Sequence, residues 1–162
     1  MDSHDKRQRA EDLLAQALRE QSIENYAAAE ELYQQSITAH PTAEAHTFLG
    51  WTYSFMGRLD DAIAQCRLAI SIDPSFGNPY NDIGSYLMKQ GKMEEAIGWL
   101  ERAKAAPRYE PRHFPYLNLA RIYLAAGKFE LASREFAQAQ FLHQEIMHGT
   151  GAGNDRSQDT LN

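Results

Sequence analysis

A block of about 34 residues recurs along the chain, and this recurrence constrains the fold more than any other feature of the sequence. Each copy contains a glycine followed by a basic, an apolar and an acidic residue, then any residue and an alanine. The copies are Gly57-Arg58-Leu59-Asp60-Asp61-Ala62, Gly91-Lys92-Met93-Glu94-Glu95-Ala96 and Gly127-Lys128-Phe129-Glu130-Leu131-Ala132. A period of this length is typical of solenoids, in which each unit buries its apolar face against its neighbours.

Small residues recur at matching places upstream and downstream of this motif. Because short side chains let two helices approach closely, we expect these residues to form the contact within each helix pair. They are Gly50 with Ala62 and Ala69, Gly84 with Ala96 and Ala103, and Ala120 with Ala132 and Ala139. The chain also contains 23 Ala and no Val, which favours helices over strands.

The glycine of each motif is expected to end a helix in a left-handed conformation, which glycine adopts without a Cβ clash. Acidic residues behind it, Asp60-Asp61 and Glu94-Glu95, then fall in the first turn of the next helix, where the helix dipole favours negative charge. We therefore interpret them as helix-start charges and not as paired catalytic carboxylates.

This pattern resembles the tetratricopeptide repeat, a helix-turn-helix unit of about 34 residues. A weaker copy lies N-terminal to the three motifs, where Ala17 stands for the family's glycine and Glu20 for its tyrosine. In the last copy, Gln144 stands where the family has a closing proline. The resemblance covers about residues 10–146 and implies an all-α fold, a right-handed superhelix of four helix-turn-helix pairs (an α-solenoid).

Boundaries follow from the motif positions. Helices are expected near residues 6–22, 26–39, 43–56, 59–72, 77–90, 93–105, 113–126 and 129–147. The repeat domain at 10–146 divides into repeats at 10–42, 43–76, 77–110 and 113–146. A polar lead-in at 1–9 precedes it, and a flexible polar tail at 147–162 follows it.

Charge and residue usage bear on function class and compartment. A net charge of −6 argues against binding to nucleic acid or anionic lipid, and no run of residues is apolar enough to insert into a membrane. The N-terminus lacks the apolar core of a signal peptide, and the one cysteine, Cys66, allows no internal disulfide, so a cytoplasmic protein is expected.

Scattered histidines such as His143 and His148 do not have metal-ligand spacing, and no nucleophile or phosphate-binding motif is present. We expect no enzymatic activity, no cofactor and no metal.

In the resembling family, first-helix positions line a concave groove that binds extended peptides, which implies an adaptor or scaffold function. Carried over by offset, the groove residues are Glu44, Thr47, Phe48, Trp51, Phe55, Asn78, Asn81, Asp82, Ser85, Lys89, Phe114, Leu117, Asn118 and Arg121. Some members hold a C-terminal carboxylate with a set of lysine, asparagine and arginine residues, but the corresponding positions here are Thr47, Trp51, Asp82, Phe114 and Asn118, so this clamp is absent. The resemblance therefore implies a protein or peptide partner recognised without such a carboxylate, and the alternative is that Trp51 and Phe55 pack between neighbouring helix pairs.

A second surface lies on the last predicted helix. Repeat arrays usually finish with a polar helix, but this one carries Phe136, Phe141, Leu142, Ile146 and Met147. The alternative function is thus a self-assembling scaffold or a co-chaperone-like subunit that docks, or forms a homo-oligomer, through this end face.

The segment Arg102–Arg112 combines basic and aromatic residues and suggests contact with a phosphate or an acidic partner. Because Glu101 and Glu110 interleave with the basic residues, we favour a solvated loop without a binding role.

Overall fold

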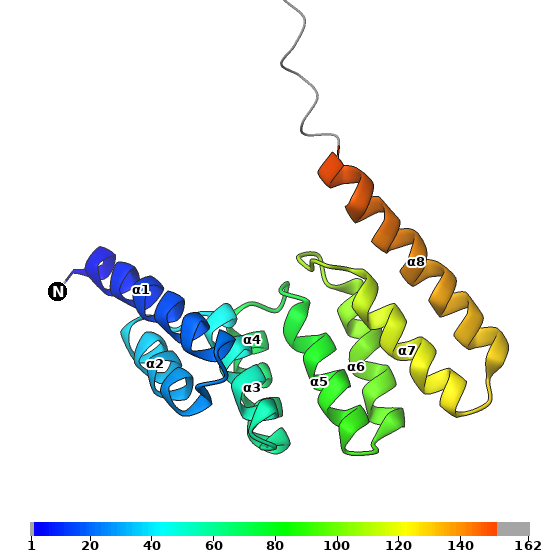
Figure 1. Ribbon diagram of the computed structural model, residues 1–162, viewed down its shortest axis with the longest axis horizontal. Helices are drawn as coiled ribbons and strands as arrows, with labels where there is room; N and C mark the ends of the chain where they lie inside the picture. The colour runs from blue at the N-terminus through cyan, green and yellow to red at the C-terminus, as the bar shows by residue number, and fades with distance from the viewer. Residues whose placement is uncertain (1, 152–162) are drawn as a thin grey trace, which may run out of the picture. The chain divides into compact units, whose positions relative to one another are not determined.

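The computed structural model describes residues 2–151 and contains eight α-helices within that range (Figure 1). They are α1 (Ser3–Ser22), α2 (Tyr26–Ala39), α3 (Ala43–Phe55), α4 (Leu59–Ile72), α5 (Asn78–Lys89), α6 (Met93–Ala105), α7 (His113–Ala125) and α8 (Phe129–Gly151). The described residues form no strand beyond a single parallel bridge between Phe76 and Arg108. The predicted all-α helical-repeat solenoid is therefore confirmed.

The helices belong to two compact units, the first ending at Tyr109 and the second beginning at Glu110. In the first unit, α1 pairs with α2, α3 with α4, and α5 with α6, and α2–α3 and α4–α5 contacts join successive pairs (Figure 1). In the second unit, α7 pairs with α8. Pairing of sequence neighbours is the arrangement that short turns between antiparallel helices produce.

Three of the turns within pairs have the same geometry. Gly57, Gly91 and Gly127 have φ angles of 77°, 78° and 72°, as the motif predicts. The residue after each glycine donates its backbone N–H to a carbonyl five residues back, at 2.8–2.9 Å, which caps the preceding helix. In the first pair, which lacks the glycine, Glu24 takes this role with φ 62°, and the N–H of Asn25 closes the turn on Glu20 O at 2.9 Å.

The predicted small-residue contacts are present within the pairs. A Cβ atom added to Gly50 would lie 3.1 Å from Ala62 O, and one added to Gly84 would lie 2.6 Å from the side chain of Leu100. The predicted contact alanines of the second helices are buried: Ala62, Ala69, Ala96 and Ala103 fully, and Ala132 and Ala139 to within 5% exposure. Backbone proximity thus accounts for the spacing of small residues seen in the sequence.

Two helices extend beyond the predicted bounds. α1 begins at Ser3 because Asp2 caps it: Asp2 Oδ1 accepts hydrogen bonds from the backbone N–H groups of His4 and Asp5, at 2.6 and 2.9 Å. α8 runs to Gly151, so residues 148–151 are helical although the expected helix ended at 147. No proline interrupts this stretch, and a glycine such as Gly149 costs a helix only about 1 kcal/mol. The rest of the expected tail, residues 152–162, lies outside the described residues.

The expectation of a solvated loop around Arg108 is wrong. Residues 106–109, here called the strap, run beside residues 73–77: Arg108 N–H donates to Ser75 O at 3.0 Å, and Gly77 N–H donates to Arg108 O at 2.8 Å. Tyr109 is buried against Gly77, where a Cβ would lie 2.5 Å from Tyr109 Cβ. The strap is fixed because glycine at 77 leaves room for the tyrosine ring, a pairing that helix periodicity does not reveal.

Candidate functional site

Trp51 on α3 is the most prominent predicted groove residue of the first unit. Its side chain is 39% exposed, and its indole Nε1–H donates a hydrogen bond of 2.7 Å to Asp82 Oδ2 on α5. Phe48 meets the Trp51 ring edge-on, with centroids 5.7 Å apart, and stacks in turn on Tyr33 at 6.2 Å. The hydrogen bond and the aromatic contact together hold a half-exposed indole in one orientation.

Asp82 is the polar centre of this arrangement. Only 8% of the residue is exposed, and burial raises the pKa of its carboxyl to about 7, although hydrogen bonds from Trp51 and Asn81 act in the opposite direction. Burial also raises the pKa values of nearby Cys66, Tyr86 and Tyr109, with a smaller contribution from the Asp82 charge. These three neighbours are therefore neutral at physiological pH, and Asp82 is the group of this cluster that titrates there.

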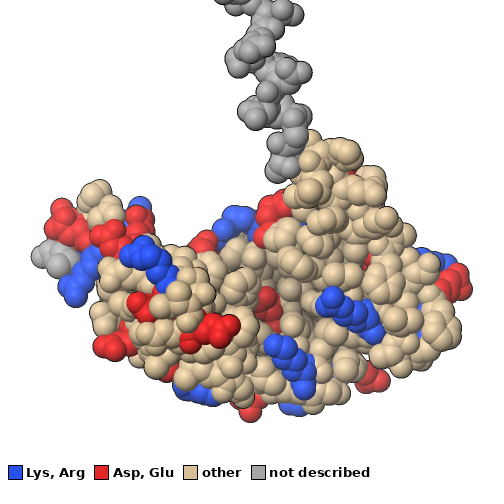
Figure 2. Space-filling model, in the orientation of Figure 1, with Lys and Arg blue, Asp and Glu red and all other residues tan. Residues whose placement is uncertain are grey.

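The other predicted residues of α3 and α5 differ in how far they are presented. Thr47 is buried and its hydroxyl donates to Ala43 O at 2.7 Å, whereas Phe55 is 58% exposed and stacks on Tyr26 with centroids 5.3 Å apart. On α5, Lys89 is exposed and Ser85 is half-buried. Asn78 and Asn81 occupy the first turn, half-buried and buried respectively. In the view of Figure 2, the surface over α3 and α5 is mostly uncharged, while acidic and basic side chains mix over α1 and α2.

The predicted α7 residues form a separate set within the second unit. Phe114 is exposed beside the His113 ring, at a centroid distance of 4.4 Å, and Leu117 is half-buried. Buried Asn118 accepts a hydrogen bond of 3.1 Å at Oδ1 from Arg121.

The predicted end face lies on α8. Phe136, Phe141 and Met147 are exposed, Met147 by 63%. Leu142 and Ile146 are half-buried and, with Glu110, Arg112 and Glu145, line a depression of about 220 Å³ within the second unit.

Sequence reasoning missed an arginine that joins three segments of the first unit. Arg108 contacts Asp73 at 2.5 Å and Glu44 at 3.0 Å, and its guanidinium lies 4.4 Å from the centroid of the Phe76 ring. Hydrogen bonds from Ser75 and then from Arg108 lower the pKa of Asp73 to about 2. Glu44, expected in the groove, is thus already paired with Arg108, and their separation of 64 residues in the sequence concealed the contact.

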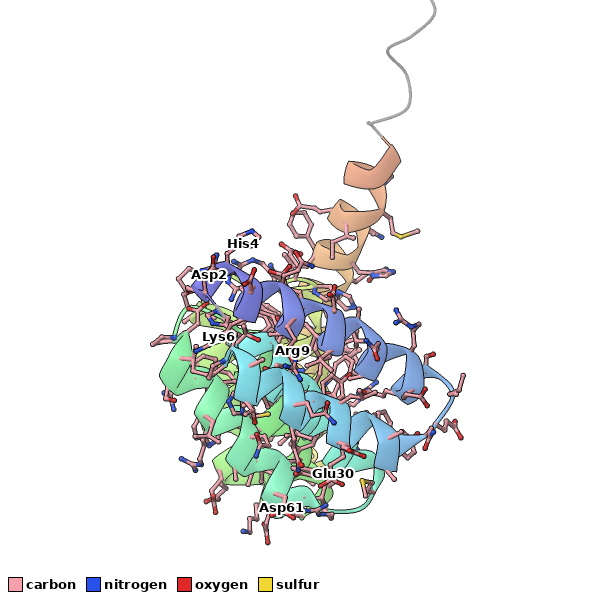
Figure 3. All side chains as sticks on the ribbon, turned by 90° about the vertical axis from the view of Figure 1, so that its left-hand side faces the viewer. Asp2, His4, Lys6, Arg9, Glu30 and Asp61 are labelled. Carbon is pink, nitrogen blue, oxygen red and sulfur yellow. The ribbon has the colours of Figure 1, made fainter. Side chains whose placement is uncertain are left out.

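Other clusters of charged and polar side chains lie on α1 and α2 and beside them. Asp2, His4 and Asp5 have possible ligand atoms within 4.8 Å of one another, the only such metal-ligand grouping among the described residues, but Asp2 and Asp5 form the helix cap (Figure 3). A shallow cleft of about 520 Å³ is lined by Lys6 and Arg9 of α1 and by residues of α2. Glu30 and Asp61, which lie near each other in Figure 3, are bridged by Arg58 at 3.2 and 2.8 Å. Over residues 2–151, no helix is long and apolar enough to cross a membrane.

Comparisons with known proteins agree with this architecture. The Small glutamine-rich tetratricopeptide repeat-containing protein 2 of Mycosarcoma maydis is 29% identical over 132 residues, which make up 81% of this chain and 36% of that protein. The chain thus spans about a third of the length of this curated relative. Among solved structures, PilF of Pseudomonas aeruginosa matches with a TM-score of 0.79 at 21% identity, covering 86% of this chain and 63% of the other. The second TPR of Spaghetti (RPAP3), solved with the HSP90 peptide SRMEEVD, matches with a TM-score of 0.60 at 22% identity, covering 64% of this chain and 96% of the other.

Models of the tetratricopeptide repeat match residues 14–75 and 78–107. The first match includes most of the N-terminal repeat, in which Glu24 takes the place of the glycine that forms the turn in the other repeats. The chain therefore belongs to the tetratricopeptide repeat family, whose members act as protein-interaction scaffolds.

Proposed function

We propose that the protein is a non-catalytic adaptor that binds an extended peptide of a partner protein on the face formed by α3 and α5. One observation carries this proposal: Trp51 presents a large ring, 39% exposed, that its hydrogen bond to Asp82 holds in one orientation. A rigid aromatic side chain offers a large contact area and loses little entropy on binding, which is typical of residues that dominate binding energy. The other predicted groove residues of these two helices are Thr47 and Phe55 on α3 and Asn78, Asn81, Ser85 and Lys89 on α5.

Two further points support a peptide as the ligand. The related fold of the second TPR of Spaghetti (RPAP3) was solved with a bound peptide. The amide of Asn78 lies in the first turn of α5, and amides of this kind form hydrogen bonds with a peptide backbone. We propose that this activity takes place in the cytoplasm and needs neither cofactor nor metal.

A displayed peptide library panned against the full chain tests this function. Selected peptides should lose roughly 30-fold in affinity for Trp51→Ala, as truncation of an anchor of about 2 kcal/mol predicts. Leu68→Ala is the matched control, because Leu68 is an apolar residue on α4, outside the proposed face, and is at 47% somewhat more exposed than Trp51. Circular dichroism should show unchanged helicity for both variants, and full affinity of Trp51→Ala would place the site elsewhere.

A second candidate function is docking or self-association through the end face on α8. The exposure of three large apolar side chains on one helix, Phe136, Phe141 and Met147, favours it, because exposed apolar surface is typical of protein interfaces. In the α7 set, Phe114, Leu117, Asn118 and Arg121 offer the second unit a further surface for a partner.

A further inference from the structure

The Trp51 ring, like those of Phe48 and Phe55 on the same helix, has no cation of the described residues over it, whereas several other aromatic rings of the first unit do. Within the described part of the first unit, an arginine or lysine of the chain itself lies over five rings. These are Tyr53 with Arg58, Phe76 with Arg108, Tyr80 and Trp99 with Arg102, and Tyr86 with Lys89. Trp51, the most exposed tryptophan and the ring type that attracts cations best, has no Lys or Arg of the described residues over it.

The carboxyl behind Trp51 likewise has no cation of its own. The groups that face Asp82 are the Trp51 indole from α3, the Cys66 thiol from α4, the Asn81 amide and Tyr86 hydroxyl from α5, and Tyr109 from the strap. All of them are neutral, whereas the described carboxylates Glu30, Asp61, Asp73 and Glu44 each contact an arginine. A buried negative charge without a partner cation is costly, and a ligand that supplies the cation would relieve that cost.

We propose that the Trp51–Asp82 pair is a subsite for a basic side chain, lysine or arginine, of the bound peptide. This inference rests on the proposed peptide-binding function. The aliphatic stem packs on the exposed indole, and the cation lies over the ring, near the carboxylate that accepts the indole N–H. Two effects favour a cation here. First, a carboxylate that accepts a hydrogen bond from the indole N–H adds electron density to the indole ring, which strengthens the attraction of the ring for a cation. Second, the electric field of the Asp82 carboxylate is weakly screened, because the carboxylate is shielded from water.

The same charge sets what the subsite rejects. A peptide's C-terminal carboxylate or an acidic side chain placed over Trp51 would face Asp82 and meet like-charge repulsion. A neutral side chain of equal length would bury the same apolar area but would not gain the attraction to the carboxylate. The subsite therefore distinguishes lysine from its uncharged counterpart norleucine, and this difference is measurable.

Two synthetic peptide pools test this inference with the full chain. They carry random neutral residues around a fixed central position, which is lysine in one pool and norleucine in the other. At pH 8 the lysine pool should bind at least tenfold more tightly than the norleucine pool. Asp82→Asn should remove this preference, so that the ratio of the two affinities falls to about one, because asparagine still accepts the Trp51 N–H bond but carries no charge.

The pH dependence provides a second readout. Because burial raises the pKa of Asp82 to about 7, the ionised fraction rises from about a tenth at pH 6 to about nine tenths at pH 8. Only the ionised form attracts the lysine, so the affinity of the lysine pool should increase several-fold, up to about tenfold, over this range. The norleucine pool should show no such rise, and neither should the lysine pool with Asp82→Asn, which keeps every histidine of the chain.

The outcomes separate this inference from the function on which it rests. Equal binding of both pools, weakened alike by Trp51→Ala, would overturn the basic-side-chain subsite and leave the peptide groove standing. A lysine preference that survives in Asp82→Asn would also overturn it. Failure of both pools to bind, with Trp51→Ala behaving as the unaltered chain does, would overturn the subsite together with the groove.

Discussion

At the scale of single residues, the turn between α1 and α2 contains a measurable strain. Glu24 has φ 62°, a left-handed conformation that disfavours any residue with a Cβ, whereas glycine occupies the same place in the other three pairs. Glu24→Gly should therefore raise the free energy of unfolding by about 0.5–1 kcal/mol in urea titrations, after allowing for glycine's greater entropy in the unfolded chain.

Glu24→Ala is the control for this substitution. It removes the same charge but keeps the Cβ, so it should give no gain. Equal stabilisation by alanine and glycine would mean that the charge of Glu24, and not its backbone conformation, is the destabilising feature.

At the scale of elements, the contact between α5 and α6 depends on the absence of one side chain. A Cβ at Gly84 would lie 2.6 Å from both Cγ and Cδ2 of Leu100, which is fully buried and cannot move away freely. Gly84→Ala should destabilise the protein by about 1–3 kcal/mol, measured by chemical unfolding. Leu100→Ala removes a buried side chain and is itself destabilising, but together with Gly84→Ala it should cost less than the sum of the two single changes, because the clash is then absent.

Gly98 on α6 provides the matched control, because a Cβ added there meets nothing within 4 Å. Gly98→Ala should stabilise the helix by up to about 1 kcal/mol through propensity alone. Loss of stability in both glycine variants would show that helix-pair contact is not the reason why position 84 is a glycine.

Most of the helices and turns follow from local features of the sequence. Gly57, Gly91 and Gly127 set three turns directly, and all eight expected helices are present. The ends of α1 and α8 were missed because a cap at Asp2 and a tolerated Gly149 decide them, and neither follows from the repeat period.

Contacts between distant residues were harder to predict. Trp51 and Asp82 were both expected at the groove from their repeat offsets, but their hydrogen bond joins residues 31 apart in the sequence. The contacts of the strap were not predicted for the same reason, since Arg108 meets Glu44 and Asp73 only once the α3–α4 and α5–α6 pairs have stacked. Periodicity predicts which face a residue occupies, whereas pairing across repeats depends on the tertiary fold.

At the scale of the whole molecule, the apolar end face of α8 bears on the oligomeric state. Phe141 and Met147 are 55% and 63% exposed, which favours burial against a second copy. Sedimentation velocity over a wide range of concentrations should show a concentration-dependent shift to larger species, which Phe141→Glu should abolish, because a buried carboxylate at an interface is costly. Phe129→Glu is the control, since Phe129 is also an exposed phenylalanine of α8 but lies at its first residue, outside the end face. A monomer at every concentration would remove self-association through this face, and equal effects of the two variants would show that the response is not specific to it.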